Sequence, residues 1–452
     1  MPVRIPGRMH MDEGYGFRHE EEIAMKQFAG KLFDSKELQD IRAKFHYVDH
    51  DFMGNRRLFF DNAGGSLRLV KAEEAFRRID EIPDCSEHSN RIALYLDEIE
   101  RKGKKDILEV IFNAKHGVLY PSYTASQIMM ELCRVLGANA NGTNVVTTML
   151  EHPSSYDGMK YYAEAYGREF RVADVNEQSG GVDADEVIRL IDKDTAILSC
   201  MAASNISGYI YDIEKIFKAA REINPDIFII CDAVQHAPHA SLDPEKYGID
   251  AMNFAPYKFF GVRGFSVAYL SDRVASFMHH RLLGKEADEW GIGSPAPAQY
   301  AAISEIVDYV TGLGKKAAAS EQDRRKLFEI GMERIAAHER ALLEIVLEGT
   351  ECVEGLRHMD GVKVQMDGAG LEQRDFIIGI EFESMGCEQA VAEYEKRGVI
   401  TFERSASSIY SKRMLDAFHS EGVVRVSPLH VNSPEEMEDF LRVTKEIAQI
   451  KV

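Results

Sequence analysis

Between about residue 58 and residue 275 the sequence alternates short, apolar, β-rich segments with amphipathic helical segments. Strand–helix–strand order of this kind favours right-handed crossovers and a mostly parallel sheet that is covered on both faces. We therefore expect an α/β fold. The strand candidates are HGVLYP, NVVTTM, EFRVADV, TAILSCMA, DIFIICDAV, AMNFAP and FSVAYLS, and the helix candidates include ASQIMMELCRVLG, DADEVIRLI and DIEKIFKAAREI.

The chain of 452 residues is too long for one ordinary domain, so we expect two. The segment 1–55 is polar and helix-leaning (EEEIAMKQFAGKLF) and is expected to pack with the smaller domain. The segment RRLFFDNAGG opens a large α/β domain over residues 56–312. A long charged helical stretch, GLGKKAAASEQDRRKLFEIGMERIAAHERALLEIVLEG, then leads into a small C-terminal α+β domain over residues 313–452.

Composition excludes several classes of protein. The formal net charge of −20 opposes binding to nucleic acid. The sequence has no apolar run long enough to span a membrane and no signal-peptide core, so we expect a cytoplasmic protein that is not bound to membranes. The six cysteines are scattered without CxxC pairs. They indicate reduced core residues and no metal site.

Polar side chains follow several of the expected strands, and ligands gather at the carboxyl ends of strands in an open parallel sheet. Lys258 lies among aromatic residues in NFAPYKFFG. It is either a surface lysine whose stem covers the rings or a desolvated amine available for imine chemistry. Asp232 follows the apolar run IFIIC, where a buried carboxylate needs a cationic partner. These two residues either form a salt bridge or hold opposite ends of a ligand.

Three further strand ends contribute polar groups. His152 follows VVTTML, Asn205 follows AILSCMAA, and Gln235 follows Asp232 closely. The segment PSYTASQ opens a helix, where its hydroxyl groups either cap the helix or help to form an anion site. Alone, each of these residues has an ordinary structural explanation.

Together, these groups match the needs of pyridoxal phosphate. This cofactor needs an amine for imine formation, a carboxylate beside its ring nitrogen, a flat group against its ring, a donor near its ring hydroxyl and a phosphate cradle. Lys258, Asp232, His152, Gln235 and the segment 122–126 can supply these in turn. The combination of these residues at successive strand ends predicts a pyridoxal-phosphate site.

The same segments resemble the class V, fold-type I pyridoxal-phosphate enzymes, from about residue 58 to the C-terminus. FFDNAGGS, LEHPSS, ASNISG, CDAVQHAPH, YKFFG and RVSPLHVNSPEE carry the likeness, which is greatest to the cysteine desulfurase-like and selenocysteine lyase-like branch. The resemblance implies a mostly parallel sheet of the seven-stranded type in a large domain, a small α+β domain, and a homodimer with active sites at the subunit interface.

The resemblance also assigns roles to residues. Lys258 would form the imine and move the proton at the α-carbon of the substrate, Asp232 would pair with the ring nitrogen, and His152 would stack on the ring. Cofactor binding would further involve Gln235, Asn205, Tyr123, Thr124, Tyr257 and, from the partner subunit, a serine at the position of Ser294. Substrate binding would involve Arg425, which clamps the carboxylate, with Arg404, Asn90 and Arg91 as further candidates.

Two departures from the family bear on the reaction. Ala255 and Tyr257 stand where serine and histidine are usual, so phosphate binding must be arranged differently. The stretch TFERSASSIYSKRMLDAFHSEG lacks the loop cysteine of the desulfurases. We expect a lyase acting on a small amino acid, with an aminotransferase, racemase or epimerase as the alternative. A non-catalytic nucleotide-binding α/β protein is a distant alternative, because DNAGGS is too short for a GxGxxG loop.

Overall fold

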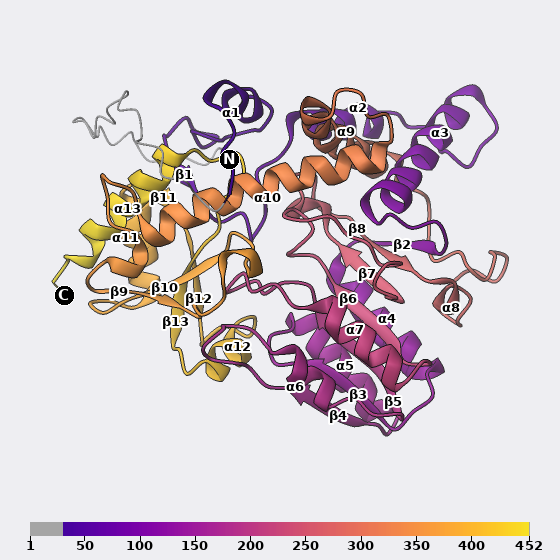
Figure 1. Cartoon of the computed structure of the whole chain (residues 1–452). Coiled ribbons are helices and arrows are strands. Elements are labelled where there is room, and N and C mark those ends of the chain that lie inside the picture. Colours follow the sequence, from indigo (N-terminus) through magenta and orange to yellow (C-terminus); the bar gives the residue numbers. More distant parts are fainter. Residues whose placement is uncertain (1–29, 452) are drawn as a thin grey trace, which may run out of the picture.

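The computed structural model describes residues 30–451, which form a large α/β unit and a smaller α+β unit linked by long helices (Figure 1). Most of the stretch EEEIAMKQFAGKLF lies outside the described residues. The described part of the N-terminal segment contains α1 (Ser35–Arg42). The Arg42 guanidinium contacts the Glu436 carboxylate at 2.9 Å, which joins this segment to the C-terminal helix α13 (Pro434–Ala448).

The large unit is built on a seven-stranded sheet with the order β2-β8-β7-β6-β5-β3-β4. Only β8 runs antiparallel to its neighbours, β2 and β7, and the other pairs are parallel. The expected mostly parallel, seven-stranded α/β fold is confirmed. Its strands are β2 (Val118–Ser122), β3 (Asn144–Thr148), β4 (Glu169–Ala173), β5 (Thr195–Met201), β6 (Phe228–Asp232), β7 (Ala251–Phe254) and β8 (Ser266–Leu270).

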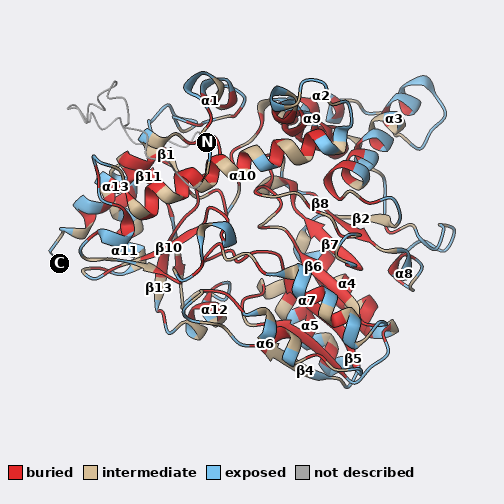
Figure 2. Cartoon of the chain, in the orientation of Figure 1, coloured by how far each residue is buried: buried red, intermediate tan, exposed pale blue. Residues whose placement is uncertain are grey.

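Both faces of the inner strands of the large sheet are buried, as the apolar strands predict, whereas the edge strands β2 and β4 are mostly only partly buried (Figure 2). In β6, Ile229 and Cys231 belong to one apolar cluster, whereas Ile230 between them belongs to another. This alternation follows from the two-residue period of a strand. The helices of this unit are α2 (Val70–Asp80), α3 (Arg91–Lys105), a π-helix (Asp106–Ile111), α4 (Ala125–Asn139), α5 (Pro153–Ala165), α6 (Ala184–Arg189), α7 (Ile213–Ile223) and α8 (Asp272–Ala275).

The small unit contains an antiparallel sheet with the order β12-β13-β10-β9. Its strands are β9 (Val362–Gln365), β10 (Ile378–Phe382), β12 (Phe402–Ser405) and β13 (Gly422–Val426). Its helices are α11 (Cys387–Lys396), α12 (Lys412–Ala417) and α13. A separate apolar cluster, which includes Phe376, Tyr394 and Phe440, forms the core of this unit.

Three details differ from the sequence-based expectation. The segment RRLFFDNAGG forms β1 (Leu58–Phe59), which pairs with β11 (Val399–Ile400) and takes no part in the large sheet. The long charged stretch forms parts of two helices, α9 (Pro297–Ala317) and α10 (Arg324–Glu348), because Asp323 caps the start of α10. The boundary expected between residues 312 and 313 falls inside α9; the domain limits themselves stay predictions.

Short 3₁₀ turns cover Pro256–Lys258, Leu356–His358 and Leu371–Gln373.

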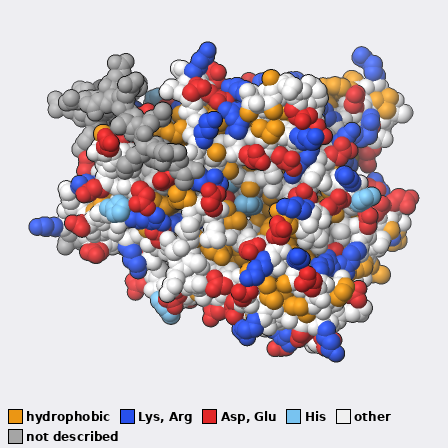
Figure 3. Space-filling view, in the orientation of Figure 1, with side chains coloured by type: hydrophobic (Ala, Val, Ile, Leu, Met, Phe, Trp, Pro, Cys, Tyr) orange, Lys and Arg blue, Asp and Glu red, His pale blue; other side chains and the backbone are white. Residues whose placement is uncertain are grey.

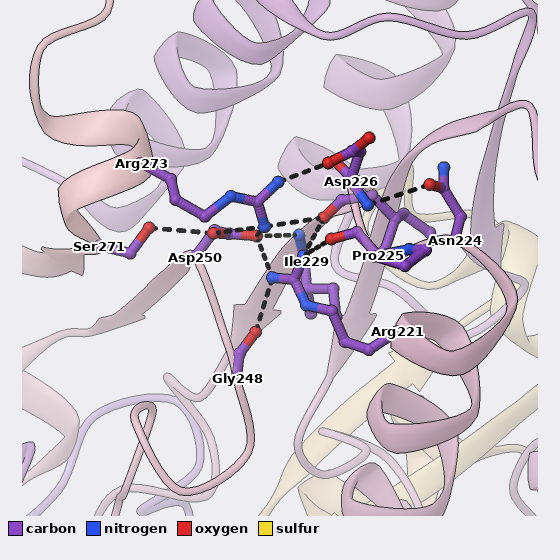
Figure 4. A network of polar contacts seen from close by, with 10 residues as sticks. Arg221, Asn224, Pro225, Asp226, Ile229, Gly248, Asp250, Ser271 and Arg273 are labelled. Atoms are coloured by element: carbon purple, nitrogen blue, oxygen red, sulfur yellow. Dashed lines mark hydrogen bonds and ion pairs between the residues drawn. The ribbon is translucent and has the colours of Figure 1, made fainter.

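A polar network around Asp250 joins the ends of three strands at the edge of the large sheet where β6 and β7 begin (Figure 4). The buried Asp250 carboxylate contacts the Arg221 guanidinium at 2.6 Å and the Arg273 guanidinium at 3.4 Å. It also accepts hydrogen bonds from the Ile229 N–H and the Ser271 hydroxyl, both at 2.9 Å. Ser271 follows β8 directly, so one carboxylate holds β6, β7 and β8 together.

We expect Asp250→Ala to lower the free energy of unfolding by about 1–3 kcal/mol, because it leaves the buried Ile229 N–H and the partly buried Arg221 guanidinium without their acceptor. Urea unfolding followed by circular dichroism measures this loss. Asp226→Ala is the matched control, because Asp226 is exposed and its backbone carbonyl makes the contact with Arg273. A midpoint for Asp250→Ala equal to that of the control would contradict the structural role of the network.

Acidic and basic side chains are interspersed over the face drawn in Figure 3, and neither sign gathers into one large patch there. Over the described residues, no helix is both long and apolar enough to cross a membrane.

Candidate active site

Several of the predicted site residues come together at one edge of the large sheet. The strands β2, β3, β5, β6 and β7 all run in the same direction, so their carboxyl ends meet at this edge. Asp232 ends β6, and Lys258 lies on a 3₁₀ turn four residues beyond β7. His152 and Asn205 follow β3 and β5.

Lys258 has the properties of an amine that is kept partly out of water. Its Nζ donates a hydrogen bond to Gln235 Oε1 at 3.3 Å and lies 6.0 Å from the Tyr257 ring centroid. Burial and the nearby Arg425 guanidinium lower the pKa of Lys258 to about 8, against the opposing effect of Asp232. The amine is therefore largely neutral above pH 8, where an ordinary lysine is charged. The interpretation of Lys258 as a surface lysine does not fit this environment.

Asp232 is a buried carboxylate with 8% of its surface exposed. Its Oδ1 accepts a hydrogen bond from the Val234 N–H at 3.1 Å. Burial raises the pKa of Asp232, whereas this hydrogen bond and the Lys258 charge oppose the increase. In the described residues no ion-pair contact joins Asp232 to Lys258, so the pair does not form the simple salt bridge that the sequence left open.

His152 presents a neutral ring beside these groups. Its Nδ1 accepts the Ser154 N–H at 3.2 Å and lies 2.8 Å from the Ser154 hydroxyl, so His152 also caps α5. Burial and the Lys258 charge lower the pKa of His152 to about 4. The ring centroid of Tyr410 lies 6.3 Å away. A neutral imidazole fixed in this way suits stacking better than proton transfer at neutral pH.

Arg425 reaches the site from β13 of the small sheet. Only 3% of its surface is exposed. One guanidinium nitrogen donates to Asp61 Oδ1 at 2.8 Å and another to the Asn205 carbonyl at 3.3 Å. The Asn205 side-chain Oδ1 is itself buried and has no hydrogen-bond partner among the described residues. Arg425 thus joins the small sheet to the segment after β5.

Arg404 lies on β12, although the sequence placed it in a loop. Only 6% of its surface is exposed, and its guanidinium donates to the Tyr410 carbonyl at 2.7 Å. Burial and the neighbouring Arg425 lower the pKa of Arg404 to about 9. The site therefore contains two buried arginines from the same sheet.

The proposed phosphate segment lies at the start of α4, at the same edge of the large sheet. The Thr124 hydroxyl caps α4 by accepting the Gln127 N–H at 3.1 Å, and Tyr123 is 76% exposed. Tyr257 is half-buried, and Arg263 lies over its ring at 4.5 Å. Gly65 lets this arginine approach, since a Cβ there would lie 2.4 Å from Arg263 Nη2.

Three predicted residues are not joined to this cluster by contacts within the described chain. Asn90 caps α3 by accepting the Ile92 and Ala93 N–H groups, and Arg91 is exposed at the start of that helix. Ser294 is exposed and donates to Glu87 at 3.4 Å. Their roles stay predictions, and that of Ser294 requires a second subunit.

The aminotransferase class-V family matches residues 83–440, which is more than half of the chain. The chain belongs to the aminotransferase class-V family. This confirms the resemblance inferred from the strand-end motifs and identifies an enzyme with the class V fold.

Curated relatives of this class V enzyme include the probable cysteine desulfurase 2 of Mycobacterium leprae, which is 26% identical over 336 residues, or 71% of this chain and 77% of the relative. A probable cysteine desulfurase of Streptomyces coelicolor is 26% identical over 370 residues, or 77% of this chain and 83% of the relative. Among solved structures, a cysteine desulfurase from Thermococcus onnurineus has a TM-score of 0.76 at 19% identity and covers 91% of this chain and 98% of its own. The last similarity supports the fold.

The class V site fits pyridoxal phosphate. Lys258 offers an amine with a lowered pKa, Asp232 a buried carboxylate, and Asn205 a buried amide oxygen that has no partner among residues 30–451. The first turn of α4 provides backbone N–H groups for an anion. No cluster of three or more potential metal-ligating His, Cys, Asp or Glu side chains occurs in the described part of the chain.

The sequence analysis missed two acidic residues of the class V site. Asp61 contacts Arg425 across 364 residues of sequence, and no local pattern could have indicated this pair. Glu151 precedes His152 and is fully buried. Its carboxyl group accepts the Met201 N–H at 2.8 Å and contacts the hydroxyls of Thr148 and Ser155.

We expect Glu151→Gln to remove a pH dependence of stability. Burial raises the pKa of Glu151 from 4.5 to about 8, so the folded state keeps a proton that the unfolded state has lost. Stability therefore falls as the pH rises through this window, by about 2 kcal/mol between pH 6 and pH 8. Urea midpoints at both pH values should differ more in the wild type than in Glu151→Gln. Equal pH dependence in the two proteins would show that Glu151 is ionised in the folded state.

Proposed function

We propose that the protein is a pyridoxal-phosphate-dependent lyase that acts on a small amino acid. The observation that carries this proposal is the position of the Lys258 amine, on the turn after β7, within electrostatic reach of the buried Asp232 carboxylate at the end of the neighbouring β6. The likeness to proteins named cysteine desulfurases supports a lyase. The bound cofactor would supply an electron sink for the bond that breaks at the α-carbon.

Each residue of the site has a role that follows from its position. Lys258 would hold the cofactor through its amine, whose pKa is lowered to about 8, and the same amine would take and return the proton at the substrate α-carbon. Asp232 would keep the ring nitrogen of the cofactor protonated, and the neutral imidazole of His152 would stack on the ring. Gln235 and Asn205 are placed to contact the ring hydroxyl. Arg425 binds the substrate carboxylate bidentately.

Transamination is the second candidate reaction, because the family that matches the chain is described as aminotransferase class-V. Persulfide chemistry by a loop cysteine is not favoured, since residues 401–422 contain no cysteine. The nearest cysteine in sequence, Cys387, starts α11 and is half-buried, with its Sγ 3.9 Å from the Arg404 carbonyl.

We further propose a cytoplasmic homodimer in which Ser294 of one subunit reaches the phosphate site of the other. This arrangement is supported by the exposure of Ser294, whose side chain contacts Glu87 and Cys85 within its own chain. Sedimentation of the purified protein tests it. A strictly monomeric protein that binds the cofactor would refute the shared site.

The cofactor proposal is tested by adding pyridoxal phosphate to purified protein and recording the visible spectrum. Borohydride reduction should then fix a pyridoxyl group to the tryptic peptide that contains Lys258. A protein that stays colourless, or a label on another lysine, would refute the proposal. Incubation with a panel of amino acids, followed by assays for pyruvate, ammonia, sulfide and amino-group transfer to a keto acid, distinguishes a lyase from a transaminase.

A further inference from the structure

Arg404 and Arg425 project from the same face of the small sheet. In the antiparallel pair β12–β13, Phe402 is opposite Arg425 and Arg404 is opposite Val423. Residues that oppose each other share a face, and so do residues two apart on one strand. The two arginines are therefore diagonal neighbours, with Cβ atoms about 7 Å apart. Their long side chains can contact two ends of one small molecule.

The two guanidinium groups differ in their partners. Arg425 is paired with Asp61, which shows that its position accepts a carboxylate. Arg404 forms no ion pair within the described residues; it donates to the Tyr410 carbonyl, and its Nε is buried without a hydrogen-bond partner. A buried cation without an anionic partner is costly. The charge of Asp61 also acts on Arg404, but the Asp61 carboxylate is paired with Arg425, so Arg404 has no ion-pair partner of its own among the described residues.

The electrostatic effects of the cluster place Arg404 near the reacting amine. The charge of Arg404 lowers the pKa of both Lys258 and His152. Its hydrogen-bond partner Tyr410 lies with its ring 6.3 Å from the His152 ring. Arg404 thus belongs to the wall of the site, beside the position where Arg425 would hold a substrate carboxylate.

We propose that the substrate is an amino acid with a second carboxylate on its side chain, held by Arg404 while Arg425 holds the α-carboxylate. This inference rests on the proposed function for the amino-acid chemistry. A planar, bidentate guanidinium matches a carboxylate, and a buried arginine beside another arginine rejects a neutral side chain, which would leave it unpaired. An apolar or thiol side chain leaves the Arg404 charge without a partner.

The test uses ligands that cannot react, so it does not depend on turnover. Calorimetric titration compares succinate with its monoamide, succinamate, which has the same length and one carboxylate fewer. Wild-type protein, with and without added pyridoxal phosphate, should bind succinate about 30-fold more tightly or better. Arg404→Gln should reduce this preference to below about threefold, and Arg404→Lys should retain part of it.

Arg442→Gln is the control for a general change in charge, because Arg442 is a half-exposed arginine on α13 that pairs with Glu438 and Asp439. It should keep the full preference for succinate. Equal affinity of wild-type protein for the two ligands would overturn the inference even if Arg404→Gln failed to fold. A preference that persists in folded Arg404→Gln would also overturn it.

The outcome is separable from that of the proposed function. If the protein takes up pyridoxal phosphate on Lys258 but binds succinate and succinamate equally, only the inference of a dicarboxylic substrate is refuted. If the protein prefers succinate but never becomes coloured with pyridoxal phosphate, the inference of a two-arginine site is retained and the cofactor proposal is refuted.

Discussion

Lys258→Ala is expected to lower kcat by about 10⁴-fold and to abolish covalent attachment of pyridoxal phosphate. In the proposed function this residue supplies both the covalent link and the proton transfer at the α-carbon, and general acid–base catalysis alone is typically worth about 10²–10⁴-fold. Its amine is set apart from ordinary lysines by burial and by Arg425, which together lower its pKa to about 8. Steady-state rates on the substrate found in the amino-acid panel, and mass spectrometry after borohydride treatment, measure the two losses.

Lys246→Ala is a matched control, since Lys246 is an exposed lysine beside an aromatic residue, Tyr247. It should leave the rate and the pyridoxyl label unchanged.

The pH dependence of the chemical reactivity of the amine gives a second check on Lys258. In wild-type protein freed of cofactor, acetylation of Lys258 by a trace of acetic anhydride should rise with a midpoint near pH 8, because the neutral amine is the reactive form. Turnover that survives in Lys258→Ala would rule out the assigned role.

Asp232→Asn is expected to reduce kcat by about 10²–10³-fold while the fold is retained. An amide is similar in shape to the carboxylate but carries no negative charge to hold a proton on the ring nitrogen, and losing one such buried electrostatic contact typically costs this much. Asp232 is suited to the role because its carboxylate is buried at a strand end and has only the Val234 N–H as a hydrogen-bond donor within the described chain. Stopped-flow or steady-state rates measure the effect.

Asp226→Asn makes the same chemical change at an exposed residue just before the start of β6 and should not alter kcat. Asp232→Glu should recover part of the lost rate, because it restores the charge at a displaced position. Full activity in Asp232→Asn would mean that the carboxylate does not contact the cofactor ring.

The large sheet and the edge that carries the site could be predicted from sequence, because strand periodicity and the order of elements are local signals. The seven strand candidates correspond to β2 through β8, and Lys258, Asp232, His152 and Asn205 all follow strands that end at one edge. Parallel topology alone is enough to bring these residues together.

The small sheet was harder to predict because its pairings are formed by distant segments. Arg404 lies in TFERSAS, where Phe402 and Glu403 give no clear apolar pattern, and β12 exists because β13 pairs with it. The contact between Asp61 and Arg425 is likewise set by tertiary structure, through the bridge between Asp61 and Ser427. The break between α9 and α10 had a local signal in Asp323, a good helix-capping residue.

The division of the site between two sheets has a thermodynamic consequence. The Lys258 amine belongs to the large unit, on the turn after β7, whereas Arg404 and Arg425 belong to the small sheet. A ligand bound to both sheets shifts the equilibrium toward the arrangement in which the two units are docked, by an amount set by its affinity. The free energies of substrate binding and of domain docking are therefore linked. Ligands that bind more tightly should make the two units unfold together in one cooperative transition.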